Sequence, residues 1–231
     1  ETLDHLEVYA KAHEISYQRE NFSIDFLGIA SHVARPELGD NAIIKGLTAI
    51  GEVLQEAWAF ELVHYFKQTR GHEFGFSSAD AVMGPLNLSL TQVSYDQGTI
   101  CLFVDIRFPD GFTAEELLIS ISKHLPLYQS ELIYQEPLIV TEDKSPFVRT
   151  LYKTYQEVFD DVNSLPYYSG GVTYSKCYEG RCVAYGMRYP GDPREERAHQ
   201  RDEYTVLSDL KKLAGLYANA LVRLANCEET A

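Results

Sequence analysis

The order of apolar and polar positions predicts alternating helices and strands over the first part of the chain. Apolar residues recur at helical spacing over residues 2–15, which predicts a short amphipathic helix. The run "NFSIDF" (21–26) alternates with period two and predicts a half-buried strand. Asp40 or Asn41 can cap the next helix, whose apolar positions continue, with a break, to about residue 69.

A hairpin, a helix and a strand are predicted next. "LNLSLTQV" (86–93) and "TICLFVDIRF" (99–108) alternate on either side of a turn with Gly98. The capping-box sequence "TAEE" then begins a helix, and "ELIYQEPLIV" (131–140) predicts a last strand. The resulting order, strand–helix–strand–strand–helix–strand (βαββαβ), is typical of a ferredoxin-like α+β domain. This fold hosts many functions and alone indicates none.

The pattern changes after residue 140. Ser145 and Pro146 begin a helix, and a Gly-rich turn, a short apolar strand "RCVAYGM" (181–187), a long loop and a leucine-bearing helix follow. These elements cannot enclose much core unaided. We therefore expect a ferredoxin-like domain over residues 1–140 and the tail of a larger, incomplete α/β domain over residues 141–231.

Composition and charge restrict the class of protein. The 231 residues carry a formal net charge of −14, which argues against binding to nucleic acid or to anionic lipid. No run approaches the ~18 apolar residues of a membrane helix, and no signal peptide opens the chain. Four cysteines are too few for a disulfide scaffold, so we expect a cytoplasmic protein. The opening "ETLDHLEVYA" predicts that the chain is a fragment that begins inside a helix.

Three places could carry chemistry. They are His32 in "GIASHVARPELGDNA" (28–42), Arg107 at a strand end, and the pair "SGGVTYSK" (169–176) and "PGDPREERAHQRDEY" (190–204). Each has an ordinary interpretation. A histidine in a turn is usually hydrogen-bonded locally, an arginine on the polar face of a strand is usually an ion-pair partner, and two glycines usually form a plain turn.

The order and spacing of these segments resemble one family. "GIASHVARPELGDNA" resembles the lid motif of the zinc dipeptidases of the PepV type, metallopeptidases related to acetylornithine deacetylase, succinyl-diaminopimelate desuccinylase and aminoacylase. "MGPLNLSLTQVSYDQGTICLFVDIRFP" (83–109) is similar to the family's lid hairpin. "SGGVTYSKCYEGRCVAYGMRYPGD" (169–192) and "AHQRDEYTVLSDLKKLAGLYANALVRLA" (198–225) are similar to its C-terminal signature. The resemblance covers nearly all of the chain.

This resemblance implies a fold and a reaction. Residues 1–140 correspond to the ferredoxin-like lid, possessing only the second of its two lobes, and residues 141–231 to the C-terminal part of the catalytic domain. The family hydrolyses amide bonds at a pair of zinc or manganese ions, with a glutamate as general base. His199 is the implied metal ligand, and His32 is the implied donor to the oxyanion.

The resemblance also implies residues that bind substrate. Arg107 corresponds to the group that grips the C-terminal carboxylate of a dipeptide, and a planar guanidinium suits that role. Backbone N–H groups of Gly170 and Gly171, with Thr173, complete this part of the pocket. Val172 departs from the family pattern, which has a third glycine there, and this could narrow the pocket.

The paired metals, their bridging aspartate and the general base belong to the family's N-terminal half. Neither a histidine-x-aspartate nor a glutamate pair in a metal context occurs in this sequence. We therefore expect this chain to be inactive alone and to require that N-terminal half as a partner. "CYEGRC" could suggest a metal clip, but no second cysteine pair follows, so Cys177 and Cys182 are predicted to be free thiols.

Two alternatives remain open. The chain could be a non-catalytic ferredoxin-like module for binding or homo-oligomerisation, which would be a stable fold without metal. It could instead belong to an N-acyl amino acid deacylase of the same family. Assays of dipeptides and N-acyl amino acids with zinc or manganese would separate these readings.

Overall fold

The structure, a computed structural model, describes residues 1–33, 35–76, 79–80, 84–136, 141–142, 144–167, 173–178, 181–186 and 201–226. The chain divides into two compact units, Glu1–Ile133 and Tyr134–Ala231, and each is described by itself. The sequence places the boundary between residues 140 and 141. The assignment of the two parts to a lid and a catalytic domain stays a prediction.

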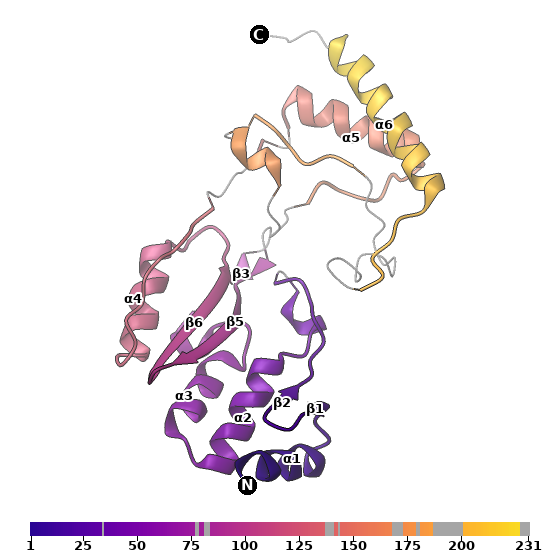
Figure 1. Ribbon diagram of the computed structural model, residues 1–231. Coiled ribbons are helices and arrows are strands. Elements are labelled where there is room, and N and C mark those ends of the chain that lie inside the picture. Colours follow the sequence, from indigo (N-terminus) through magenta and orange to yellow (C-terminus); the bar gives the residue numbers. More distant parts are fainter. Residues whose placement is uncertain are drawn as a thin grey trace. The chain divides into compact units, whose positions relative to one another are not determined.

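The first unit contains most of the regular structure (Figure 1). Its elements are α1 (Thr2–Ala12), β1 (Tyr17–Arg19), β2 (Ile24–Phe26), η1 (Pro36–Leu38), α2 (Ala42–Leu54), α3 (Ala57–Phe66), η2 (His72–Phe74), β3 (Ala79–Asp80), β4 (Gly84–Pro85), β5 (Asn87–Asp96), β6 (Thr99–Arg107) and α4 (Ala114–His124). The second unit contains α5 (Pro146–Phe159), η3 (Tyr174–Tyr178) and α6 (Leu207–Ala225).

The β5–β6 hairpin is the centre of the first unit. Its register pairs Asn87 with Arg107 at the open end and Asp96 with Thr99 at the turn. Gln97 and Gly98 both have positive φ, at 47° and 85°, as a tight two-residue hairpin turn requires. The hairpin predicted around Gly98 is therefore confirmed.

Helices α2, α3 and α4 cover the apolar face of this hairpin (Figure 1). The buried side chains that meet there come from the hairpin, the helices and the connection between α3 and β5: Leu47, Ala59, Leu62, Phe66, Phe74, Phe76, Leu86, Leu88, Leu90, Leu117 and Leu125. Burial of this apolar surface is the main stabilising contribution to the first unit.

Three predicted helix starts have the expected caps. Asn41, rather than Asp40, caps α2, because its Oδ1 accepts a hydrogen bond from the backbone N–H of Ile43 at 2.9 Å. The capping box of α4 is present, with Thr113 and Glu116 exchanging hydrogen bonds. Ser145 caps α5.

Two predicted strands differ from the structure. Residues 131–136 form no strand, and Leu132, Ile133 and Tyr134 are exposed, so no neighbouring strand or apolar face pairs with this run. Residues 181–186 also form no strand. Residues 137–140 and 187 lie outside the described part. Among the described residues the strands form three two-stranded antiparallel sheets. The four-stranded sheet of a ferredoxin-like lid therefore stays a prediction.

In the second unit, α5 packs against α6 and Tyr185 links the two helices. Its hydroxyl donates to the carbonyl oxygen of Leu151 on α5 at 2.9 Å, and its own carbonyl accepts from the Tyr217 hydroxyl on α6 at 2.9 Å. Burial raises the pKa of Tyr185 to about 12. The predicted strand is thus replaced by an irregular segment that fastens two helices together.

Within the described ranges, no helix combines the length and apolar character that crossing a membrane requires.

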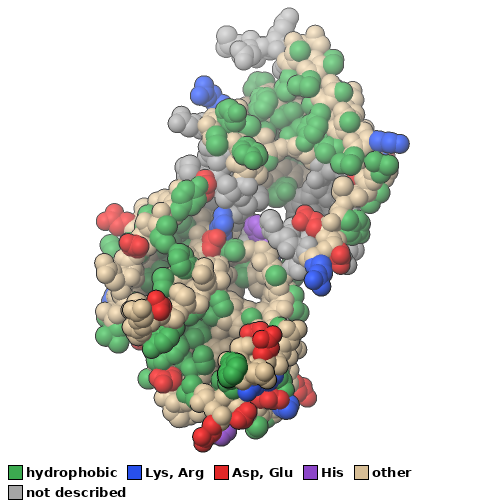
Figure 2. Space-filling model, viewed as in Figure 1, with side chains coloured by type: hydrophobic (Ala, Val, Ile, Leu, Met, Phe, Trp, Pro, Cys, Tyr) green, Lys and Arg blue, Asp and Glu red, His purple; other side chains and the backbone are tan. Residues whose placement is uncertain are grey.

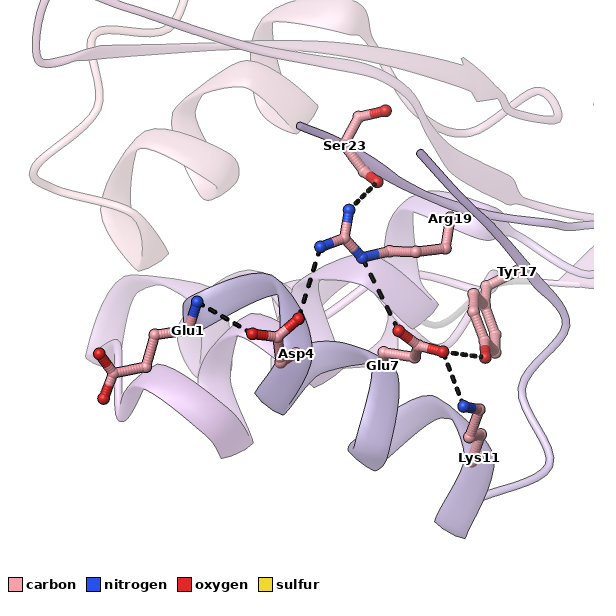
Figure 3. Close-up of polar contacts among 7 residues, drawn as sticks. All are labelled: Glu1, Asp4, Glu7, Lys11, Tyr17, Arg19 and Ser23. Atoms are coloured by element: carbon pink, nitrogen blue, oxygen red, sulfur yellow. Dashed lines mark hydrogen bonds and ion pairs between the residues drawn. The ribbon is translucent and has the colours of Figure 1, made fainter. Parts of the chain in front are cut away.

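A polar network joins α1 to the β1–β2 hairpin (Figure 3). The Glu7 carboxylate forms an ion pair with Lys11 at 2.7 Å and accepts a hydrogen bond from the Tyr17 hydroxyl at 3.0 Å. Arg19 reaches Glu7 and Asp4 and donates to the Ser23 carbonyl oxygen at 3.1 Å. The hydrogen bonds from Lys11 and then Tyr17 hold the pKa of Glu7 below its ordinary value.

We expect Glu7→Gln to flatten the acid limb of the stability profile. A carboxyl group whose pKa is lowered on folding stabilises the folded chain above its ordinary pKa of 4.5 and loses this contribution as the pH falls through the lowered value. Urea unfolding between pH 7 and pH 3 measures the effect. Glu20→Gln, in the exposed turn after β1, is the control. An unchanged pH profile in Glu7→Gln would contradict the role of the network.

Candidate functional site

The turn that carries His32 is a closed loop. Ile29 and Asp40 form an isolated antiparallel bridge, in which each backbone N–H donates to the other's carbonyl oxygen at 2.9 Å. Within the loop, the Arg35 N–H donates to the His32 carbonyl oxygen at 2.8 Å. His32 is partly buried. The loop therefore holds His32 between two ends that are fixed to each other.

Two glycines allow the ends of this loop to approach so closely. A Cβ on Gly28 would lie 2.2 Å from the carbonyl oxygen of Asp40. A Cβ on Gly39 would lie 2.9 Å from the carbonyl oxygen of Ile29 and 2.4 Å from the Ser31 hydroxyl. Because the nearest obstacles include backbone atoms, a side chain at either position would open the bridge.

The base of the loop is fixed to the β5–β6 hairpin. The amide of Asn41 donates from Nδ2 to the carbonyl oxygen of Leu90 on β5 at 2.9 Å, while its Oδ1 caps α2. Lys45 on α2 donates to the carbonyl oxygen of Leu27 at 2.8 Å and forms an ion pair with Asp40. The His32 loop, the start of α2 and the hairpin are thus joined by polar side chains.

Arg107 is the last residue of β6 and forms a two-point contact with Asp105 on the same strand. The distances are 2.8 Å from Nε to Oδ1 and 2.9 Å from Nη2 to Oδ2. Residues two apart on a strand lie on the same face, so the guanidinium can reach this carboxylate: Nη2 donates a hydrogen bond to it, and Nε makes a charge contact. The side chains are 29% and 33% exposed. The ordinary interpretation of Arg107 as an ion-pair partner is therefore present in the structure, and its binding of a substrate carboxylate stays a prediction.

Arg70, between α3 and β5, was not singled out by the sequence. Its Nη1 donates to Oδ1 of Asn87, the residue that pairs with Arg107 in the hairpin. Its Nη2 lies 3.5 Å from the Glu37 carboxylate in η1. Asn87 is only 7% exposed, so loss of this charge-assisted hydrogen bond would cost about 1–3 kcal/mol. The sequence signal that could have pointed to this contact was Asn87 itself, a polar residue at the start of the apolar strand "LNLSL".

The structure thus connects, in one region of the first unit, the two segments that carry His32 and Arg107. The loop that holds His32 reaches Arg70 through Glu37, and Arg70 reaches the Arg107 end of the hairpin through Asn87. Asp105 joins this region through Arg107. The charged side chains along this connection are Arg70, Arg107, Glu37 and Asp105, and an arginine is suited to binding a small molecule with an anionic group.

The other predicted site residues belong to the second part of the chain. Thr173 belongs to the second unit, where its hydroxyl accepts a hydrogen bond from the Ser175 backbone N–H at 3.3 Å and is exposed. Gly170, Gly171 and His199 lie outside the described residues, as does Val172.

Potential metal ligands do not converge in the described parts of the two units. There, no three histidine, cysteine, aspartate or glutamate side chains come close enough together to share a metal ion. Cys101, Cys177 and Cys182 are free thiols, as predicted for the last two.

Comparisons with known proteins point to peptidases. No protein-family profile matches the chain. The chain is 29% identical over 224 residues to "Putative dipeptidase YtjP" of Bacillus subtilis (strain 168), covering 92% of the chain and 46% of that protein. It is 27% identical over 205 residues to a "Putative dipeptidase" of Staphylococcus aureus (strain USA300), covering 85% of the chain and 43% of that protein.

These relatives support a dipeptidase-like family for the chain. The chain spans less than half the length of the curated relatives it matches.

We expect Gly28→Ala to open the His32 loop. The added methyl group cannot fit beside the Asp40 carbonyl oxygen, so the free energy of unfolding should fall by roughly 1–3 kcal/mol. Amide hydrogen exchange at Ile29 and Asp40 should accelerate, because their bridge breaks. The control is Gly46→Ala in α2, where the new Cβ would meet only the Phe26 ring, at 3.4 Å. Undisturbed exchange at both amides in Gly28→Ala would refute the steric argument.

Proposed function

We propose that this chain is the lid and the C-terminal catalytic segment of a PepV-type dipeptidase, which hydrolyses dipeptides that have a free C-terminal carboxylate. The similarity to "Putative dipeptidase" relatives over most of the chain supports the reaction class. The observation that carries the proposal is the polar connection between the His32 loop and the Arg107 end of the hairpin.

The proposed roles follow from the chemistry of these side chains. His32 donates a hydrogen bond to the oxygen of the scissile amide, where negative charge develops as water attacks. Arg107 binds the C-terminal carboxylate of the dipeptide through its planar guanidinium. Backbone N–H groups of Gly170 and Gly171, with the Thr173 hydroxyl, contribute to the pocket for that carboxylate.

The proposed enzyme uses two zinc ions, with manganese as the alternative metal, and His199 is the ligand that this chain supplies. The metals provide an acidified water for amide hydrolysis. The resemblance implies that the remaining ligands and the general base belong to the N-terminal half of the family's catalytic domain. The chain alone is therefore expected to be inactive.

The second unit presents a surface that this other segment could cover. One face of α6 packs on α5 through Leu216 and Ala220, whereas Leu207, Leu210 and Leu221 are 47–68% exposed. Figure 2 shows hydrophobic side chains gathered on the visible face of this unit. A soluble helix usually has one apolar stripe, and a second stripe is typical of a helix with another neighbour. We propose that the neighbour is the N-terminal half of the catalytic domain, and a second copy of the chain is the alternative.

The proposed activity is tested on the complete enzyme with zinc or manganese, using dipeptides and N-acyl amino acids as substrates. We expect turnover of dipeptides. Turnover of N-acyl amino acids alone would indicate a deacylase, and a stable fold that turns over neither would indicate a non-catalytic module. The 231-residue chain, assayed beside the complete enzyme, should show no turnover.

In the complete enzyme, His32→Ala should lower kcat roughly 10²–10³-fold with little change in KM, as expected on removing one donor to an oxyanion. His5→Ala, on an exposed position of α1, is the matched control and should be neutral. His32→Gln retains a donor and should recover part of kcat. An unaltered kcat in His32→Ala would exclude the oxyanion role.

Arg107→Ala and Asp105→Asn should change KM in opposite directions. Removing the guanidinium should raise KM for dipeptides about 10- to 100-fold, because a charge-assisted contact is lost. Asp105→Asn retains an acceptor oxygen but removes the charge that competes with the substrate carboxylate, so KM should fall several-fold. If the pair were only structural, both substitutions would lower stability and leave KM unchanged.

A further inference from the structure

Arg70 connects two segments that are far apart in the sequence. It lies between α3 and β5, and its guanidinium contacts Glu37 in η1 and Asn87 at the start of β5. Glu37 belongs to the loop that carries His32, and Asn87 pairs with Arg107 across the hairpin. A single side chain therefore links the loop that carries His32 to the open end of the hairpin, where Arg107 lies.

The backbone beside Arg70 is fixed to the same strand. The N–H of Leu88 donates to the carbonyl oxygen of Thr69 at 2.7 Å, so the residue before Arg70 is bonded to the residue after Asn87. The backbone that carries the Arg70 side chain is consequently held against the hairpin. Its remaining freedom is limited by the buried amide of Asn87 and the carboxylate of Glu37.

The geometry requires an arginine rather than another cation. The contact to Asn87 uses Nη1 and the contact to Glu37 uses Nη2, so two terminal nitrogens of one planar group serve two partners on different elements. A lysine has one charged nitrogen on a flexible stem and lacks this fork. It could hold either partner but not reproduce both contacts in the same positions.

We propose that Arg70 is a positioning residue that sets the place of the His32 loop relative to the Arg107 end of the hairpin. We call the contacts of Arg70 with Glu37 and Asn87 the clamp. The effect of Arg70 on catalysis rests on the proposed function, whereas the clamp itself does not. Arg70 touches neither substrate nor metal in this proposal. It acts through His32 on one side and Arg107 on the other.

The clamp is tested on the 231-residue chain without any substrate. In Arg70→Met, amide hydrogen exchange over residues 28–41 should accelerate by roughly tenfold, since the loop loses one anchor. The NMR signals of the His32 imidazole and the Arg107 Nε–H, assigned through His32→Gln and Arg107→Lys, should both shift. Lys67→Met is the matched control, because it removes a nearby exposed positive charge at the end of α3. It should leave the exchange rates and both signals unchanged.

Two further variants keep the test decisive if Arg70→Met folds poorly. Glu37→Gln alters an exposed carboxylate and should accelerate exchange over residues 28–41 while leaving the Arg107 signal in place. Arg70→Lys should give intermediate exchange. If Arg70→Met and Glu37→Gln together perturb the loop as the sum of the two single changes, the residues are not coupled and the clamp is refuted.

In the complete enzyme, Arg70→Met should lower kcat and raise KM together, because it displaces both His32 and Arg107, and Arg70→Lys should recover part of each. Lys67→Met should change neither. Loss of stability with unchanged kcat and KM would overturn the positioning role. Failure of dipeptide turnover in the unmodified enzyme would refute the proposed function instead, and the exchange and NMR results would still decide the clamp.

Discussion

The architecture of the candidate site depends on one side chain, Asn41, that satisfies two backbone groups at once. Its Oδ1 accepts from an N–H of the first turn of α2, and its Nδ2 donates to the Leu90 carbonyl oxygen on β5. A helix start and a strand edge both leave backbone groups without partners in their own element. Because one amide serves both, the start of α2 is fixed in position against the hairpin. The closed loop before Asn41 inherits that position, and with it His32.

Several helix starts and one hairpin turn, in both units, could be predicted from the sequence, since their signals are local. The caps at Asn41, Thr113 and Ser145 and the turn at Gly98 depend on residues within four positions of one another. The predicted strand at 131–140 failed over residues 131–136 for the opposite reason. A strand is stable only when another strand pairs with it, and an alternating apolar run cannot specify that partner. The same holds for residues 181–186, where a Tyr185 side chain links two helices instead.

The candidate site was less predictable, because its connections join distant residues. The residues His32 and Arg107 were identified by resemblance, but nothing local in the sequence connects them. The contact between Arg70 and Asn87 spans 17 positions, and the contact between Arg70 and Glu37 spans a longer segment that includes α2 and α3. The need for glycine at position 28 arises from the carbonyl oxygen of Asp40, on the other side of the loop. Such constraints follow from tertiary approach, which periodicity and turn chemistry do not encode.

Arg107 has two interpretations, as the ion-pair partner of Asp105 and as the group that binds a substrate carboxylate. Both rest on the same contact between a guanidinium and a carboxylate. A guanidinium that holds the Asp105 carboxylate through an ion pair and a hydrogen bond from Nη2 can hold a substrate carboxylate by the same chemistry. In the proposed enzyme, Asp105 orients this fork while no substrate is bound and competes with the substrate for it. The cost of that competition is moderate because both side chains are about one-third exposed, so water screens the ion pair. An internal carboxylate that preorganises a cation, in a site where the cation remains accessible to solvent, is compatible with reversible binding of a small anionic ligand.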